Sequence, residues 1–314
     1  MLNIKYQKVG SRVMAYSIFG KEQIDLVIEM GLGACMGEWW HIAQKLSETH
    51  TVLLYERFGC GNSQKSKTAR TPANIAGELY NLLENLPHKD QIAILAHSQG
   101  GLYAQQFTRL YPELVEKLIL LDPLSANDNR FKRELSKRVY KKSGVDKRSG
   151  LYINLVLARL HLGKIIKGFM REAPPFYYFN GFSAEAADYI LNCLTQPKVY
   201  ATALEEYRNS HSEDAISGLK SKNGFPQIPV RLITHSSGLA IKEIEEFGGL
   251  RYDEAQKIEN IWQNIMQDYL LLSDYSELYE AKNSSHYIHL TDLDLISEVT
   301  DLGYRFPHKS YSPY

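Results

Sequence analysis

Four short apolar runs, none with alternating polar positions, constrain the fold of this 314-residue chain more than any other feature. Such runs are typical of strands that are covered on both faces, as in a parallel sheet. The segments between them have helical periodicity, the pattern of parallel strands joined by crossover helices. The runs are residues 24–29, 51–55, 92–96 and 118–121. We therefore predict an α/β fold with a mostly parallel central sheet flanked by helices.

The segments around these runs complete the predicted layer. Residues 5–9 and 12–19 alternate more strongly and predict an antiparallel edge hairpin that turns at Gly10 and Ser11. Thr71 is the expected N-cap of a helix that begins at Pro72. We also expect helices at 99–110 and 258–271 and strands at 230–234 and 278–281. A last helix is expected to begin near Thr291 and to extend towards Tyr304, because Thr291 and Asp294 have the spacing of a capping box.

Residues 124–225 lose the strand signal and become helical, basic and aromatic. We interpret this segment as a helical cap inserted into a core formed by residues 1–123 and 226–314. Its aromatic sequence FYYFNGF, at residues 176–182, is expected either to line an apolar access route or to form the cap's own core.

The charge balance of the chain limits the classes of partner that it is expected to bind. The 36 Lys and Arg balance the 36 Asp and Glu, so no global field of one sign favours nucleic acid or an anionic membrane surface, and a small molecule is the expected partner. No apolar run has the length of a signal peptide core or a membrane span, which predicts a cytoplasmic protein. Oligomeric state stays open, a homodimer included.

The three cysteines stand far apart without the spacing of a zinc site or a disulfide framework. They are Cys35, Cys60 and Cys193. We interpret them as reduced thiols and predict neither a metal nor a cofactor.

The sequence IAILAHSQGG, at residues 92–101, runs from a buried strand directly into Ser98 and then into paired glycines and a helix. A serine hydroxyl is a poor nucleophile unless a sharp turn presents it to a base, and small neighbours such as Ala96 and Gly100 permit that turn. Because the same turn opens a helix, the amide of Gln99 is placed to bind a developing oxyanion.

Four motifs in this chain resemble those of the α/β-hydrolase superfamily, in the order in which the family carries them. AHSQG at 96–100 resembles the nucleophile motif GxSxG, with Ala96 at the first glycine position. The other three are MGLG at 30–33, YERFGCGNS at 55–63 and SSHYIHL at 284–290. The resemblance covers nearly the whole chain and implies a serine hydrolase with a lid, similar to esterases and lipases, with Ser98 as nucleophile.

The resemblance also implies the base and the acid. His286 lies in the family's histidine loop, whereas His97 is expected to support the site and His289 to be a structural residue. Relatives usually carry the acid after the strand represented here by VRLIT, but the loop that follows has no aspartate. A minority carry it one strand earlier in an LDP sequence, which matches Asp122. Asp128 and Glu243 are the reserve candidates.

The backbone amides of Leu32 and Gln99 match the family's oxyanion donors, and Arg57 is expected to hold neighbouring backbone or carboxylates. Epoxide hydrolases and haloalkane dehalogenases of this fold attack with aspartate, so Ser98 excludes both activities. Hydrolysis of a small or medium apolar ester, thioester or lactone is the main hypothesis. One alternative is an aminopeptidase or amidase, in which Glu205 and Glu206 could recognise an amine, although a solvated helix face is the favoured interpretation of these two residues. The other is a non-catalytic binding or sensor protein.

Overall fold

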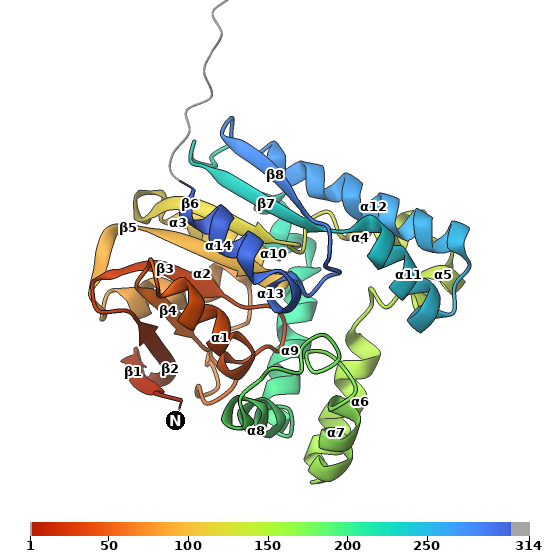
Figure 1. Cartoon of the computed structure of the whole chain (residues 1–314), viewed down its shortest axis with the longest axis horizontal. Coiled ribbons are helices and arrows are strands. Elements are labelled where there is room, and N and C mark those ends of the chain that lie inside the picture. The colour runs from red at the N-terminus through yellow and green to blue at the C-terminus, as the bar shows by residue number, and fades with distance from the viewer. Residues whose placement is uncertain (1, 303–314) are drawn as a thin grey trace, which may run out of the picture.

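The computed structural model describes residues 2–302 and contains one eight-stranded sheet (Figure 1). Its strands are β1 (Lys5–Val9), β2 (Arg12–Phe19), β3 (Ile24–Glu29), β4 (Val52–Tyr55), β5 (His88–His97), β6 (Val115–Leu121), β7 (Val230–His235) and β8 (Ser276–Ala281). The spatial order is β1-β2-β4-β3-β5-β6-β7-β8. Strand β2 is antiparallel to both of its neighbours, β1 and β4, and strands β3 to β8 are mutually parallel. The predicted fold class and edge hairpin are confirmed.

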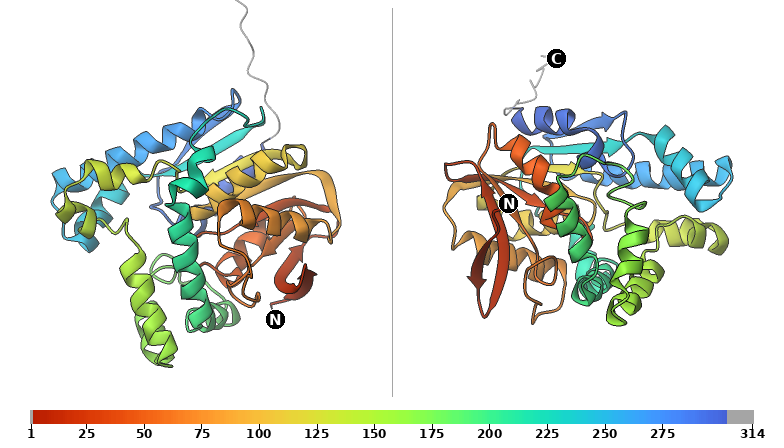
Figure 2. Two further views of the ribbon diagram at one scale, coloured as in Figure 1. Left: turned by 180° about the vertical axis from the view of Figure 1, so that it is seen from behind. Right: turned by 60° about the horizontal axis from the view of Figure 1, so that its bottom comes forward.

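Helices cover both faces of the sheet (Figures 1 and 2). Helices α2, α3 and α12 pack on one face, and α1 and α14 pack on the other. The helices are α1 (Met36–Leu46), α2 (Pro72–Leu83), α3 (Gln99–Leu110), α4 (Asn129–Glu134), α5 (Lys137–Lys142), α6 (Arg148–Arg159), α7 (Gly163–Met170), α8 (Ala184–Cys193), α9 (Pro197–Ser210), α10 (Glu213–Ile216), α11 (Ser237–Gly248), α12 (Tyr252–Leu270), α13 (Ile288–Thr291) and α14 (Leu293–Asp301), with short 3-10 turns at Pro112–Leu114 and Ser217–Leu219.

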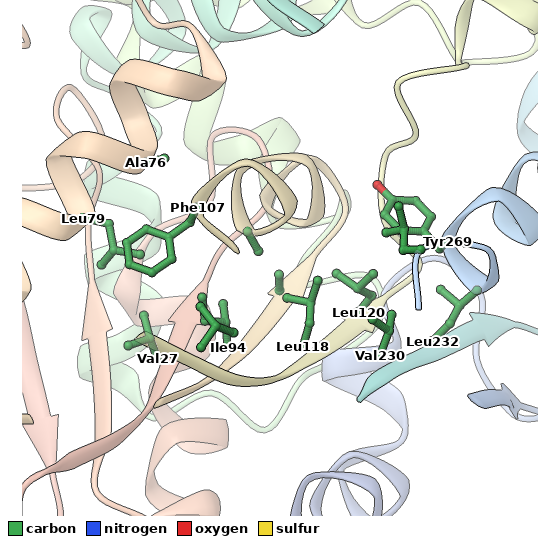
Figure 3. Close-up of a cluster of buried hydrophobic side chains, with 14 of the residues drawn as sticks. Val27, Ala76, Leu79, Ile94, Phe107, Leu118, Leu120, Val230, Leu232 and Tyr269 are labelled. Carbon is green, nitrogen blue, oxygen red and sulfur yellow. The ribbon is translucent and has the colours of Figure 1, made fainter. Parts of the chain in front are cut away.

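The larger core lies between the sheet and helices α2, α3 and α12, and Figure 3 shows part of it. Val27 and Ile94 of the central strands face Leu79 of α2 and Phe107 of α3. These four side chains are at most 1% exposed. Burial of a side chain of this size contributes about 1.5–3 kcal/mol, so the central strands are held rigidly and their carboxyl ends are fixed in space.

The carboxyl ends of β3, β5, β6, β7 and β8 lead into the loops that carry the candidate site residues. In an open sheet with parallel strands, ligands bind in the crevice outside this edge. Ser98 follows β5, Asp122 follows β6 and His286 lies in the loop after β8. Residues separated by up to 188 positions in the sequence are thereby brought to one place.

Two local expectations are wrong. The last helix, α14, takes Asp292 rather than Thr291 as its N-cap, because the Asp292 carboxylate accepts a hydrogen bond from the amide of Leu295. Thr291 instead ends the short helix α13. The predicted continuation to Tyr304 lies outside the described residues. Residues 176–182, which lie in the segment expected to be helical, form turns and irregular chain instead.

Between β6 and β7 the chain forms seven α-helices, α4 to α10, and no strand within this fully described stretch. Helices α6, α7, α8 and α9 extend from the carboxyl edge of the sheet (Figure 1). We propose that the cap begins at residue 124 and ends at residue 225. Among residues 2–302, no helix has both the length and the apolar character needed to cross a bilayer.

Candidate active site

Ser98 stands on a sharp turn between β5 and α3. Its backbone has φ 52° and ψ −124°, a region that a non-glycine residue adopts only where the surrounding structure enforces it. The enforcement comes from the backbone, because the Ser98 amide donates to the Leu121 carbonyl at 3.0 Å and the Ser98 carbonyl accepts from the amides of Gly101 at 3.0 Å and Leu124 at 2.7 Å. The turn is therefore fixed to β6 and its following loop.

The glycines after Ser98 are required by close packing. A Cβ on Gly100 would lie 2.3 Å from the Glu29 carbonyl oxygen, and a Cβ on Gly101 would lie 2.4 Å from the Pro123 Cβ. Neither neighbour is the end of a flexible side chain. The first turn of α3 thus packs directly against the ends of β3 and β6.

Substituting Gly100→Ala is expected to destabilise the protein by about 1–3 kcal/mol, because the added methyl group must displace backbone. Gly77→Ala in α2 is the matched control, since its Cβ would meet only the Tyr111 hydroxyl at 3.8 Å and alanine favours a helix by about 0.5–1 kcal/mol. Urea unfolding of the two variants measures the difference. Equal stabilities would contradict the packing described for the turn.

The structure brings Ser98, His286 and Asp122 together. His286 Nε2 lies 3.0 Å from Ser98 Oγ, and His286 Nδ1 lies 2.6 Å from Asp122 Oδ2. Both distances are within hydrogen-bonding range, so one imidazole links the hydroxyl to the carboxylate. With Nδ1 protonated towards Asp122, Nε2 is left to accept the hydroxyl proton.

Buried aromatic residues hold the histidine loop in place. His97, at the end of β5, contacts the backbone carbonyl of His286 through Nε2 at 2.9 Å. Burial, together with the nearby imidazoles of His289 and His286, lowers the pKa of His97, which is consistent with a neutral supporting residue. His289 is fully buried, stacks on Trp39 at 4.3 Å and contacts Glu38 at 2.7 Å, so it has a structural position as expected.

Asp122 has unusually many donors. The residue is fully buried with φ 44°, and its Oδ2 is contacted by His286 and, at 2.7 Å, by His235 Nδ1. Its Oδ1 accepts from the indole of Trp262 at 2.9 Å. Burial alone would raise the pKa of Asp122, but the charge of His235 and the hydrogen bonds from both histidines hold that pKa below its ordinary value. Asp122 is therefore a carboxylate at neutral pH.

His235 occupies the end of β7, the position at which the resemblance led us to expect an acid. Its second ring nitrogen, Nε2, lies 2.9 Å from Glu259 Oε2 on α12. An imidazole between two carboxylates donates from both nitrogens and carries a positive charge. Although burial lowers the pKa of His235, Asp122 and Glu259 together raise it to about 10. Glu259 is itself held by Ser237 and Gln263, each at 2.7 Å.

The pKa of His235 predicts a pH-dependent stability. Because its folded-state pKa of about 10 exceeds the ordinary 6.5, the stabilisation is complete below pH 6.5 and is lost as the pH rises through about 10. The melting temperature of wild type should exceed that of His235→Gln most at pH 6.5, and the difference should shrink as the pH approaches 10. Glu259→Gln should move the loss to lower pH. A difference that stays constant over this range would contradict a charged His235.

The candidate oxyanion donors lie at the start of α3 and in the loop after β3. Gly31, Leu32 and Gln99 line the same cavity as Ser98. The first amides of a helix have no intrahelical acceptor, which leaves the Gln99 amide available for a ligand. Arg57 fixes the loop after β3, since its Nη1 donates to the Met30 carbonyl at 2.5 Å and its Nη2 to the Gly31 carbonyl at 2.9 Å.

A buried ion network joins this loop to the inserted helices. Arg57 holds backbone and carboxylates as expected, but the sequence did not place Glu206 in the network. Glu206 of α9 is fully buried and pairs with Arg57 at 3.0 Å and Arg70 at 3.2 Å. Arg57 also pairs with Glu29 at 2.6 Å. Glu205 accepts a hydrogen bond from the Arg70 amide at 3.1 Å. The expectation of a solvated helix face is wrong for Glu206, because the partners come from loops more than 130 residues away in sequence.

The reserve acids do not contact His286. Asp128 pairs with His211 of α9 at 2.8 Å, and Glu243 of α11 accepts from the Tyr178 hydroxyl at 2.9 Å. Both line the cavity beside Ser98. Of the three acids proposed from sequence, Asp122 is the one with a hydrogen bond to the candidate base.

A cavity of about 660 Å³ opens over Ser98 and His286. Its walls combine apolar side chains from the inserted helices with Trp262 of α12 and Tyr287 of the histidine loop. Tyr178 is the one residue of the 176–182 segment on the cavity wall, whereas Phe176 and Phe182 pack beside Cys35 and Cys193. The aromatic segment thus contributes mainly to packing.

Cys35, Glu56 and Cys193 form a buried group with metal-ligand chemistry that linear spacing could not reveal. Their ligand atoms lie within 4.8 Å of one another. Glu56, however, already accepts from the amides of Met36 at 3.1 Å and Asn62 at 2.6 Å and from the Tyr189 hydroxyl at 2.9 Å. Cys35, Cys60 and Cys193 are all free thiols. The contact with Cys193, and then burial, raise the pKa of the Cys35 thiol. We interpret the group as packing between α1 and α8.

Residues 26–160 match the family model described as the alpha/beta hydrolase fold. An AB hydrolase superfamily protein of Gibberella zeae is 22% identical over 285 residues, which is 86% of this chain and 83% of that protein. The abhydrolase domain-containing protein abhd-5.2 of Caenorhabditis elegans is 29% identical over 123 residues, which is 38% of this chain but only 28% of that protein.

Among solved structures, the epoxide hydrolase CorEH superposes with a TM-score of 0.66 at 17% identity and covers 95% of this chain and 96% of its own. At this identity the likeness concerns the fold alone. The sheet order, the serine turn after β5 and the family model matched over residues 26–160 agree, and the chain has the α/β-hydrolase fold.

Proposed function

We propose that this protein is a serine hydrolase that cleaves a carboxylic ester with a small or medium apolar acyl group. Thioesters and lactones would react by the same route. The observation that carries the proposal is the unbroken hydrogen-bond chain from Ser98 Oγ to His286, at 3.0 Å, and from His286 to Asp122, at 2.6 Å. This is the arrangement that turns a serine hydroxyl into a nucleophile.

In the first step, Ser98 Oγ attacks the carbonyl carbon while its proton passes to His286 Nε2. The carbonyl oxygen becomes an oxyanion, which the amides of Leu32 and Gln99 stabilise. The tetrahedral intermediate then collapses, the bond to the leaving group breaks, and His286 returns the proton to the departing alcohol. The acyl group remains bonded to Ser98.

In the second step, a water molecule takes the place of the alcohol. His286 accepts its proton and the hydroxide attacks the acyl carbon. The second oxyanion then collapses, the bond between the acyl carbon and Ser98 Oγ breaks, and His286 returns the proton to Oγ, which releases a carboxylic acid and restores the Ser98 hydroxyl. Throughout, Asp122 holds the Nδ1 proton of His286 and stabilises the imidazolium. We further propose that His235 and Glu259 keep Asp122 ionised and oriented, since His235 Nδ1 contacts the same Oδ2 as His286 and Glu259 holds the other ring nitrogen of His235.

Contacts within the fold weigh against the two alternatives. Amine recognition by Glu205 and Glu206 was the sequence argument for an aminopeptidase, and Glu206 is instead neutralised by Arg57 and Arg70. A non-catalytic binding protein is favoured if the base has no acid partner, as the loop after β7, which has no aspartate, would suggest. The Asp122 carboxylate at 2.6 Å from His286 answers that argument.

A matched substrate panel tests the proposal. Purified wild type is assayed on esters, a lactone and amides that share one short acyl group, with the Gly77→Ala protein as a folded control. We expect turnover of the ester and far slower release of amine from the amide. Release of amine at a rate equal to or above that of alcohol would favour an amidase, and binding without any turnover would favour a sensor protein.

A further inference from the structure

The overall charge balance of this chain conceals a strongly basic segment. Residues 130–172 hold 13 lysines and arginines against three aspartates and glutamates, whereas the rest of the chain holds 23 against 33. The segment comprises α4 to α7 and the turn after α7. One part of the insertion between β6 and β7 is therefore cationic, while the rest of the chain carries the compensating negative charge.

The same segment exposes large apolar side chains on its outer side. On α6, Tyr152 is 62% exposed and Ile153 is 58% exposed, while on α7 Phe169 is 71% exposed. The set that we call the α6–α7 outer face consists of Tyr152, Ile153, Val156, Leu160, Leu162, Ile165 and Phe169. On α6 these residues recur at the spacing of a single helix face. Because α6 and α7 pack together, these exposed side chains lie on neighbouring helices, and apolar residues gathered in this way mark an interaction site.

The opposite sides of the two helices are already used for packing. Leu155 and Ala158 of α6 pack with Ile166 of α7 and Tyr200 of α9. The apolar residues of the outer face are therefore additional to those needed for the core of the insertion. Figure 1 and the left view of Figure 2 show α6 and α7 extending from the body of the molecule, at a distance from the β1–β2 edge.

We propose that the α6–α7 outer face docks onto an anionic lipid bilayer surface. Exposed basic side chains lie on the same helices, with Arg159 on α6, Lys164 on α7 and Arg171 just after it, while Arg148 pairs with Asp146. Helices with large apolar residues on one side and lysine or arginine beside them lie in the headgroup region of membranes. A second copy of the chain is a poorer occupant, because a symmetric contact would place two basic segments against each other.

Docking would also bring the active-site cavity beside the lipid phase. Gly150, Leu151 and Asn154 on α6 and Met170 at the end of α7 line the cavity, so the helices that carry the outer face also form a wall of the site. This part of the inference rests on the proposed function. It makes the substrate an ester that partitions into the lipid leaflet rather than one dissolved in water.

Vesicle co-sedimentation tests the docking surface. Wild type is mixed with vesicles of phosphatidylcholine alone and with vesicles of equal parts phosphatidylcholine and phosphatidylserine. We expect binding at least about tenfold tighter to the anionic vesicles, weakened by salt. The Ile153→Ser/Phe169→Ser and Lys164→Glu/Arg171→Glu double variants should each bind about tenfold more weakly, because one loses apolar contact and the other loses electrostatic attraction.

Matched controls carry the same changes elsewhere. Leu110→Ser/Leu271→Ser alters two exposed leucines outside the face, and Lys5→Glu/Lys8→Glu reverses two exposed charges on β1. Both should bind like wild type, and so should Ser98→Ala, which keeps this test independent of catalysis. Lack of preference for anionic vesicles, or equal losses in the controls, would overturn the proposal.

Two further readouts distinguish the remaining outcomes. Turnover of a water-soluble ester should be the same in the face variants and wild type, whereas turnover of an ester embedded in anionic vesicles should fall in the variants. Sedimentation velocity without vesicles tests self-association. A wild-type dimer that Ile153→Ser/Phe169→Ser converts to a monomer, without vesicle binding by wild type, would assign the face to a second copy and overturn the proposal.

Discussion

Replacing Ser98 by alanine is expected to lower kcat for the ester substrate by about 10⁶. Alanine removes Oγ, so no acyl-enzyme forms, while His286 and Asp122 keep their hydrogen bond. The small turnover that remains would come from direct attack by water on a substrate carbonyl that the oxyanion donors polarise.

Stability is the control for that comparison. The Ser98 turn is held by backbone hydrogen bonds to Leu121, Gly101 and Leu124, none of which uses the hydroxyl. The melting temperature of Ser98→Ala should therefore stay within a few degrees of wild type. Steady-state assays of the two proteins measure kcat, and a decrease of less than about tenfold would show that another group is the nucleophile.

Asp122→Asn is expected to lower turnover by about 10⁴ without unfolding the protein. An asparagine amide carries no negative charge and can donate a hydrogen bond to Nδ1. The imidazole of His286 is then no longer held with its proton on Nδ1, and the imidazolium loses its countercharge. The fold should tolerate the change, because Glu259 still pairs with His235 at 2.9 Å and keeps that buried charge compensated.

Asp128→Asn and Glu243→Gln are the matched controls for this prediction. Both acids line the cavity, but their hydrogen bonds go to His211 and Tyr178 rather than to His286. Each should change kcat by less than about tenfold. A loss of about 10⁴ in either control, with near-normal turnover in Asp122→Asn, would transfer the role of the acid to the other residue.

The elements that the sequence predicts best are those with local signals. Unbroken apolar runs located the central strands, and residues 24–29 coincide with β3. Thr71 caps α2 as expected, because the Thr71 side chain accepts from the Asn74 amide at 3.3 Å. The Thr291 cap failed because Asp292, one position further on, offers a carboxylate to the same helix end. Cap signals one residue apart cannot be separated from sequence alone.

Residues whose roles depend on distant partners could not be predicted. Arg57 and Glu206 are 149 positions apart, and no periodic pattern connects them. His235 appeared only as the absence of an acid after β7. Its pairing with Glu259, 24 positions later on α12, has no motif. The cationic α4–α7 segment was visible as composition, but the net charge of zero obscured what it implies.

Covalent labelling with a fluorophosphonate measures the central claim most directly, because the probe reacts only with a serine that a nearby base has activated. Intact-mass and peptide mass spectrometry of the folded wild type should find one adduct, located on Ser98. His286→Ala should react far more slowly and Ser98→Ala not at all. Folded wild-type protein that stays unlabelled, or that carries its adduct on another residue, would contradict the claim that Ser98 is an activated nucleophile.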